Sequence, residues 1–159
     1  MAAAGKFKVY DFAKKYLADG TFDMDNAALG LTMALFLSTS NCETLSVGTG
    51  VYGDLTNEHA NANGYTTGGI ALTGETWVRA ADVTTFDCDN VVWTAAGGSI
   101  VARFAVIYCN ATVNSIVKPL LCVSLLDTAP ANVTATDTNT LTIAIAAGGV
   151  FTVSGATSN

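Results

Sequence analysis

The sequence predicts an all-β fold, an antiparallel β-sandwich or jelly-roll-like module with a short N-terminal arm, a helical piece and a long Gly-rich loop. Many short runs of β-branched and aromatic residues are separated by Gly, Pro and Asn turns, and no long helical pattern lies between them. Two apolar runs, Ile100–Tyr108 and Leu120–Leu126, are bounded by turn residues and are expected to be antiparallel neighbours in the core. A chain of 159 residues fits one domain over residues 20–159 behind an arm over residues 1–19.

The N-terminal arm is expected to start extended and to continue as one or two helical turns. Phe7 and Val9 suit a strand, whereas Phe12 and Tyr16 suit one face of a short helix. Gly20 follows as a stop signal, because glycine readily adopts the conformation that ends a helix.

The remaining chain alternates between strands and turn residues. Apolar residues at every second position predict a strand over Leu31–Leu37. Six glycines then predict a long loop over residues 41–69, with a turn of helix near Asp54–His59. Further strands are expected, besides the two core runs, over Ile70–Thr73, Thr76–Ala81, Phe86–Trp93, Val133–Thr136, Thr140–Ala146 and Val150–Val153.

The composition indicates an assembling protein with an acidic body. Only 13% of the residues are charged, which leaves much uncharged surface for partners to cover. Residues 1–15 hold four lysines and one aspartate, a balance of +3 within a total of −6, so the remainder carries −9. An acidic body argues against nucleic-acid binding. No apolar run reaches the length of a membrane-spanning helix, and the N-terminal residues lack the order of a secretory signal, so we expect neither membrane nor export.

Four cysteines without a C-x-x-C pair argue against a zinc site. We expect free buried thiols, although Cys109 and Cys122 lie in the two core runs and could face each other.

Side chains able to do chemistry are few. The one histidine, His59, lies near Asp54 and Glu58, but a solvated loop histidine is the preferred interpretation over a metal ligand. Asp87 and Asp89 could share a calcium ion, yet a polar edge or turn is favoured. No nucleophile elbow or phosphate loop is present, so we expect neither an enzyme nor a cofactor.

Aromatic and basic residues supply the candidate partner contacts. Phe104 and either Trp93 or Tyr108 are expected in the core, whereas Tyr65 and Trp77 are expected to be exposed and to anchor an interface. The full candidate set comprises Lys6, Lys8, Lys14, Lys15, Tyr52, Tyr65 and Trp77.

The segments GYTTGGIALTG (Gly64–Gly74), FDCDNVVWTAAGGSIVARFAVIY (Phe86–Tyr108) and KPLLCVSLL (Lys118–Leu126) occur in an order that resembles a family of small tailed-bacteriophage virion proteins. These proteins are similar to capsid cement or decoration proteins, β-rich modules that lie on the head shell as trimers. The resemblance implies a virion protein on the capsid exterior, assembled in the host cytoplasm. Its partners would be the major capsid protein and further copies of itself.

Two alternatives stay open beside the cement protein. One is a phage tail or fibre module that binds a host carbohydrate or receptor through exposed aromatic residues such as Tyr65 and Trp77. The other is an enzyme that uses Asp54, Glu58 and His59.

Overall fold

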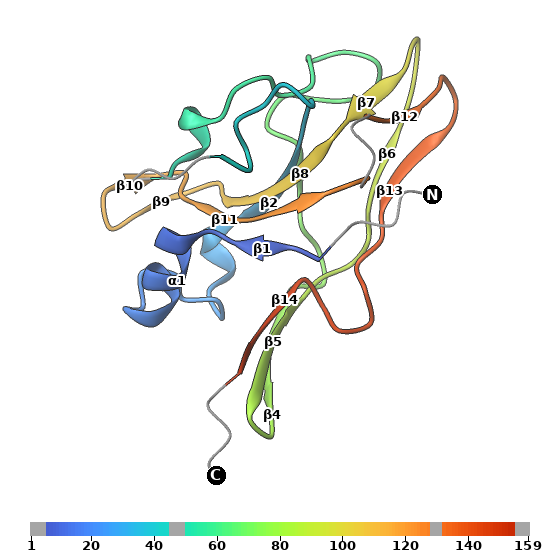
Figure 1. Ribbon diagram of the computed structural model, residues 1–159. Coiled ribbons are helices and arrows are strands. Elements are labelled where there is room, and N and C mark those ends of the chain that lie inside the picture. Colours follow the sequence, from blue (N-terminus) through green and yellow to red (C-terminus); the bar gives the residue numbers. More distant parts are fainter. Residues whose placement is uncertain (1–5, 45–49, 128–131, 155–159) are drawn as a thin grey trace.

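The computed structural model describes residues 6–44, 50–127 and 132–154, and it confirms an all-β fold (Figure 1). Every strand pairing between described residues is antiparallel. They form one five-stranded sheet and four smaller sheets. The elements are β1 (Lys8–Val9), α1 (Asp11–Ala18), η1 (Ala27–Leu29), β2 (Leu31–Phe36), η2 (Tyr52–Asp54), β3 (Ile70–Ala71), β4 (Thr76–Ala80), β5 (Val83–Asp87), β6 (Val91–Thr94), β7 (Ile100–Ala102), β8 (Phe104–Cys109), β9 (Thr112–Val113), β10 (Ile116–Val117), β11 (Leu120–Leu125), β12 (Val133–Ala135), β13 (Thr140–Ile143) and β14 (Phe151–Ser154).

The five-stranded sheet, in the order β1-β11-β8-β2-β3, holds the centre of the core. β8 pairs with β11 on one side and with β2 on the other, so the two apolar runs are antiparallel neighbours as predicted. All six residues of β8 and all six of β2 are buried. The period-two pattern therefore predicts the β2 strand correctly, although both of its faces are covered instead of one.

The N-terminal segment packs on this sheet. β1 pairs with β11, and α1 follows at once, in agreement with the predicted extended start and short helix. Tyr10, Ala13 and Tyr16 are buried, so the helix contributes one face to the core. Asp19 caps the helix with its backbone N–H on Lys15 O, and Gly20 follows with a φ of +76°.

Two strands that the sequence predicts as continuous are each divided. The expected strand Phe86–Trp93 is wrong in its bounds, since β5 ends at Asp87 and β6 begins at Val91. The core run is divided at Arg103, where β7 pairs with β12 in one sheet and β8 enters the five-stranded sheet. The polar stretch between the core runs also forms a hairpin, β9–β10.

A three-stranded sheet, in the order β14-β5-β4, extends away from the five-stranded sheet (Figure 1). Trp77, Phe86 and Phe151 are directly paired, so their side chains share the face that packs on the core. The next residues along the strands, Val78 and Thr85, point to the opposite face.

The connecting regions differ from the prediction in detail. The turn of helix expected near Asp54–His59 lies at Tyr52–Asp54 instead, and residues 45–49 of the predicted loop are outside the described residues. All four cysteines are buried and free, as expected. Within the described ranges, no helix is long and apolar enough to cross a membrane.

Candidate functional site

Glu58 fastens the Gly-rich loop to the five-stranded sheet. The backbone of Glu58 forms an isolated antiparallel β-bridge with Phe36 of β2. The carboxylate accepts hydrogen bonds from the Tyr65 hydroxyl at 2.6 Å and from the Gly68 N–H at 2.6 Å, and a further one from the Tyr52 hydroxyl. Both carboxylate oxygens are therefore occupied by donors of the same chain.

The three tyrosines around Glu58 are tied into the sheet as well. The Tyr65 hydroxyl accepts the Leu35 N–H at 3.0 Å, and the Tyr108 hydroxyl donates to Gly68 O at 2.9 Å. The rings of Tyr52 and Tyr108 stack with their centroids 4.4 Å apart. Burial, and then the hydrogen bonds to Glu58, raise the pKa of Tyr52 and of Tyr65 well above the ordinary value. Burial raises the pKa of Tyr108 to about 12. The hydroxyls stay protonated at neutral pH and serve as donors.

His59 is buried, which corrects the expected solvated loop histidine. Its Nδ1 lies 2.7 Å from Ala60 O, its backbone N–H donates to Leu35 O at 2.9 Å, and its ring lies 5.1 Å from that of Tyr65. His59 is buried because the bridge between Glu58 and Phe36 places the next residue, His59, against β2.

The residues of the enzyme alternative each have their own structural partner. Asp54 accepts the Val51 N–H at 3.1 Å, Glu58 is occupied by tyrosines, and His59 binds a backbone carbonyl. Among the described residues, no three His, Cys, Asp or Glu side chains gather closely enough to hold a metal ion. Asp87 and Asp89 instead accept bonds from the Cys88 N–H and the Thr73 hydroxyl. The arrangement suits loop attachment better than acid–base catalysis.

The aromatic anchors are less exposed than expected. Tyr65 is only 2% exposed, so the expectation of an exposed side chain is wrong for this residue. Trp77 is half-buried, with its ring 6.0 Å from that of Phe151. Tyr52 is also half-buried, between Tyr108 and the Lys118 ammonium, which lies 5.5 Å from its ring centroid. In the core, Phe104, Trp93 and Tyr108 are all buried.

The four predicted lysines are exposed but divide into two groups. Lys6, Lys8 and Lys14 line a groove of about 830 Å³ between the N-terminal segment and residues 144–152, which form the connection into β14 and its first two residues. Asp11 lies in the same groove and pairs with Lys14 at 2.7 Å, while Lys8 is 3.9 Å from Glu43. We call this feature the basic groove.

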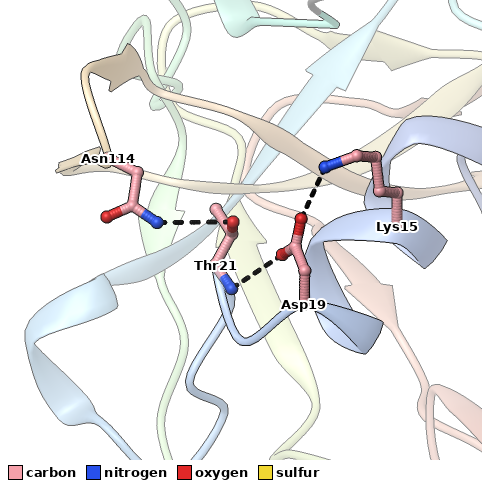
Figure 2. A network of polar contacts seen from close by, with 4 residues as sticks. All are labelled: Lys15, Asp19, Thr21 and Asn114. Carbon is pink, nitrogen blue, oxygen red and sulfur yellow. Dashed lines mark hydrogen bonds and ion pairs between the residues drawn. The ribbon is translucent and has the colours of Figure 1, made fainter.

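Lys15 is not among the residues that line this groove, and its side chain points toward Asp19 (Figure 2). Its ammonium lies 2.6 Å from an Asp19 carboxylate oxygen, and that carboxylate also accepts the Thr21 N–H at 3.0 Å. Asn114, in the β9–β10 hairpin, donates to the Thr21 hydroxyl at 3.4 Å. Hydrogen bonding to Lys15 lowers the pKa of Asp19 to about 2. Lys15 thus belongs to a network that ends α1 and joins it to the hairpin.

The predicted partner contacts do not include the exposed valines of the three-stranded sheet. Val78 is 58% exposed on β4, Val153 48% on β14, and Val83 37% on β5. The alternation in TWVRA was the available signal, because Trp77 inside places Val78 outside.

No family model, curated protein or solved structure matches this chain.

Proposed function

We propose that this chain is a capsid cement protein of a tailed bacteriophage, which assembles with itself on the head shell and stabilises contacts between major capsid subunits. The proposal places it on the capsid exterior, assembled in the host cytoplasm, as a trimer. The resemblance of its glycine turn and strand cores to small phage virion proteins supports this role.

The observation that carries the proposal is the uncovered sheet β14-β5-β4. Every second residue of each strand points to the outer face of this sheet, and one of these residues, Asp87 at one end, is charged. The outer face comprises Thr76, Val78, Ala80, Val83, Thr85, Asp87, Thr152 and Ser154. A sheet face that is apolar or uncharged and open to solvent is typical of a surface that another protein covers. We assign this outer face to the contact with the capsid.

The carbohydrate-binding alternative has less support. It needs Tyr65 and Trp77 as a stacking platform, but Tyr65 is buried and Trp77 packs toward Phe151. The enzyme alternative relies on Glu58 and His59, which are both engaged in holding the loop.

Cosedimentation with head shells tests the proposal. The purified full chain is mixed with shells that lack it, and the bound fraction is measured, together with its position in an electron-microscopy map. Val83→Glu adds a charge to the outer face and is expected to reduce binding by about tenfold. Val117→Glu, on the β9–β10 hairpin and 59% exposed, is the control on another surface and should bind normally. Failure of the unchanged protein to bind shells, or equal binding by both variants, would contradict the proposal.

A deletion of residues 1–15 would not isolate the contribution of the N-terminal lysines to shell binding. It would remove β1 and the buried side chains of Tyr10 and Ala13 along with the lysines. Point substitutions leave the core intact.

A further inference from the structure

We infer that copies of this chain associate head to tail, with the β4 edge of the three-stranded sheet in one copy lying against the β14 edge in the next. This inference refines the self-association within the proposed function and rests on it. It names the two surfaces that meet.

Both edges of the sheet are open. β5 is the middle strand, and among the described residues β4 and β14 pair with β5 alone. Each edge therefore presents backbone N–H and C=O groups that can pair with another strand. Val78 on β4 and Val153 on β14 add exposed apolar side chains at the two edges.

A groove borders part of each edge strand, residues 76–78 of β4 and residues 151–152 of β14, and the two grooves have opposite charge. The basic groove lies beside β14, where Lys6, Lys8 and Lys14 outnumber Asp11. The groove beside β4, about 320 Å³, is lined by Asp25 and Glu75 together with Trp77 and Val78, and by no lysine or arginine. We call this second feature the acidic groove.

Opposite charges on opposite edges select the geometry of association. Two acidic grooves facing each other would bring Asp25 and Glu75 against their own copies, which costs free energy. An acidic groove facing a basic groove brings unlike charges together and joins two unlike surfaces. Such a heterologous contact closes into a ring when its rotation permits, and the sheet then continues from copy to copy. A trimeric cement protein needs a contact of this kind.

Charge reversal on the full chain tests the inference, with sedimentation velocity over a range of concentrations as the readout. Asp25→Lys with Glu75→Lys reverses the acidic groove, and Lys6→Glu with Lys8→Glu reverses the basic groove. Each reversal alone should weaken self-association by about tenfold or more, because like charges then meet. All four substitutions in one chain restore unlike pairs and should return the association to within about threefold of the original.

A second pair of variants probes the apolar part of the contact. Val78→Lys places a charge on the β4 edge and should weaken association, whereas Val117→Lys, equally exposed but on the distant hairpin, should not. Circular dichroism and urea unfolding of each variant separate a lost contact from a lost fold.

The outcomes distinguish this inference from the function on which it rests. A chain that stays monomeric, or reversals without effect, or a fourfold variant no better than either double variant, would overturn the head-to-tail contact. Shell binding by such a chain would leave the cement function standing. The expected reversal pattern without any shell binding would establish the contact and reject the cement function.

Discussion

At the scale of single residues, Glu58 does the most to organise the polar part of the molecule. Three donors converge on one carboxylate that is half-buried, and two of them are tyrosine hydroxyls whose rings pack against the sheet. Charge-assisted hydrogen bonds of this kind are about twice as strong as neutral ones. The Glu58 carboxylate thus joins three parts of the loop over residues 50–69 to one another. Backbone bridges of Glu58 with Phe36 and of Val51 with Pro119 connect the same loop to its neighbours.

Removal of this carboxylate should loosen the whole loop. Glu58→Ala is expected to lower the free energy of unfolding by about 3 kcal/mol, because the Tyr52 and Tyr65 hydroxyls and the Gly68 N–H lose their acceptor. Glu58→Gln should cost about 1 kcal/mol, since the amide oxygen still accepts two donors while the charge is lost. Urea unfolding measures both. Glu43→Ala, at an exposed ion pair, is the control and should change stability by less than about 0.5 kcal/mol. Equal losses at both positions would refute the role of Glu58.

Buried tyrosines and thiols also set the response to alkaline pH. Burial raises the pKa of Tyr108, Cys42 and Cys88 to about 12, and raises those of Tyr10 and Tyr65 further. In the unfolded chain these groups lose their protons near pH 9 to 10, so between about pH 9 and 12 the folded state binds more protons. Stability is therefore complete below about pH 9 and falls as the pH rises toward 12. Urea unfolding at several pH values and tyrosinate absorbance in the native protein measure this. Native titration of these tyrosines near pH 10 would contradict it.

At the scale of elements, glycines allow the loop and strands to approach each other. Gly69 has a φ of +83°, and a Cβ there would lie 1.9 Å from Met33 O in the neighbouring β2. Gly69→Ala should cost about 2 to 4 kcal/mol, because a left-handed conformation and a backbone clash add together. Gly97→Ala is the matched control, with a φ of +76° and no atom within 4 Å, and should cost about 1 kcal/mol. Urea unfolding compares them; similar losses would show that the close approach is unimportant.

The same scale explains which strands were predictable. β8 and β11 are long apolar runs, and their antiparallel pairing follows from their hydrophobicity and the turn residues around them. The break between β5 and β6 does not follow from hydrophobicity or turn residues, since it depends on hydrogen bonds from the backbone to side chains. The Asp87 carboxylate accepts the Cys88 N–H, and the Asn90 side chain accepts the Ile145 N–H from far along the chain. The division at Arg103 likewise depends on two partners distant in sequence, because its N–H donates to Phe36 O while its carbonyl accepts the Leu126 N–H.

The candidate site shows a similar limit. Clustered lysines near the N-terminus were readable from the sequence, and three of the four do line one groove. That Lys15 belongs to another network depends on its position in the last turn of α1 beside Asp19. The acidic groove was not readable, because Asp25 and Glu75 are fifty residues apart and meet only through the fold. The burial of Tyr65 was not predictable, since its hydrogen-bond partner Glu58 is a charged residue of the kind usually expected at the surface.

At the scale of the whole molecule, the charge distribution supports assembly. An acidic chain of net charge −6 repels its own copies when they approach at random, yet the two edges of one sheet carry opposite local charge. Local complementarity then orients the encounter, while the overall repulsion opposes other contacts. The low share of charged residues leaves Asp87 as the one charged residue on the outer sheet face.

The proposed self-association should make thermal stability depend on protein concentration. If association and folding are linked, the Tm rises by about 3 °C for each tenfold increase in concentration, over a range of about 1 to 100 μM. Added salt should shrink this dependence, because at about 1 M the Debye length falls to roughly 3 Å and the grooves no longer attract each other at a distance. Differential scanning fluorimetry at several concentrations measures both effects. The variant with Asp25→Lys and Glu75→Lys should show a smaller rise in Tm over the same concentrations. A Tm that ignores concentration in the unchanged protein, or a dependence that strengthens with salt, would mean that contacts between the two grooves do not stabilise the folded chain.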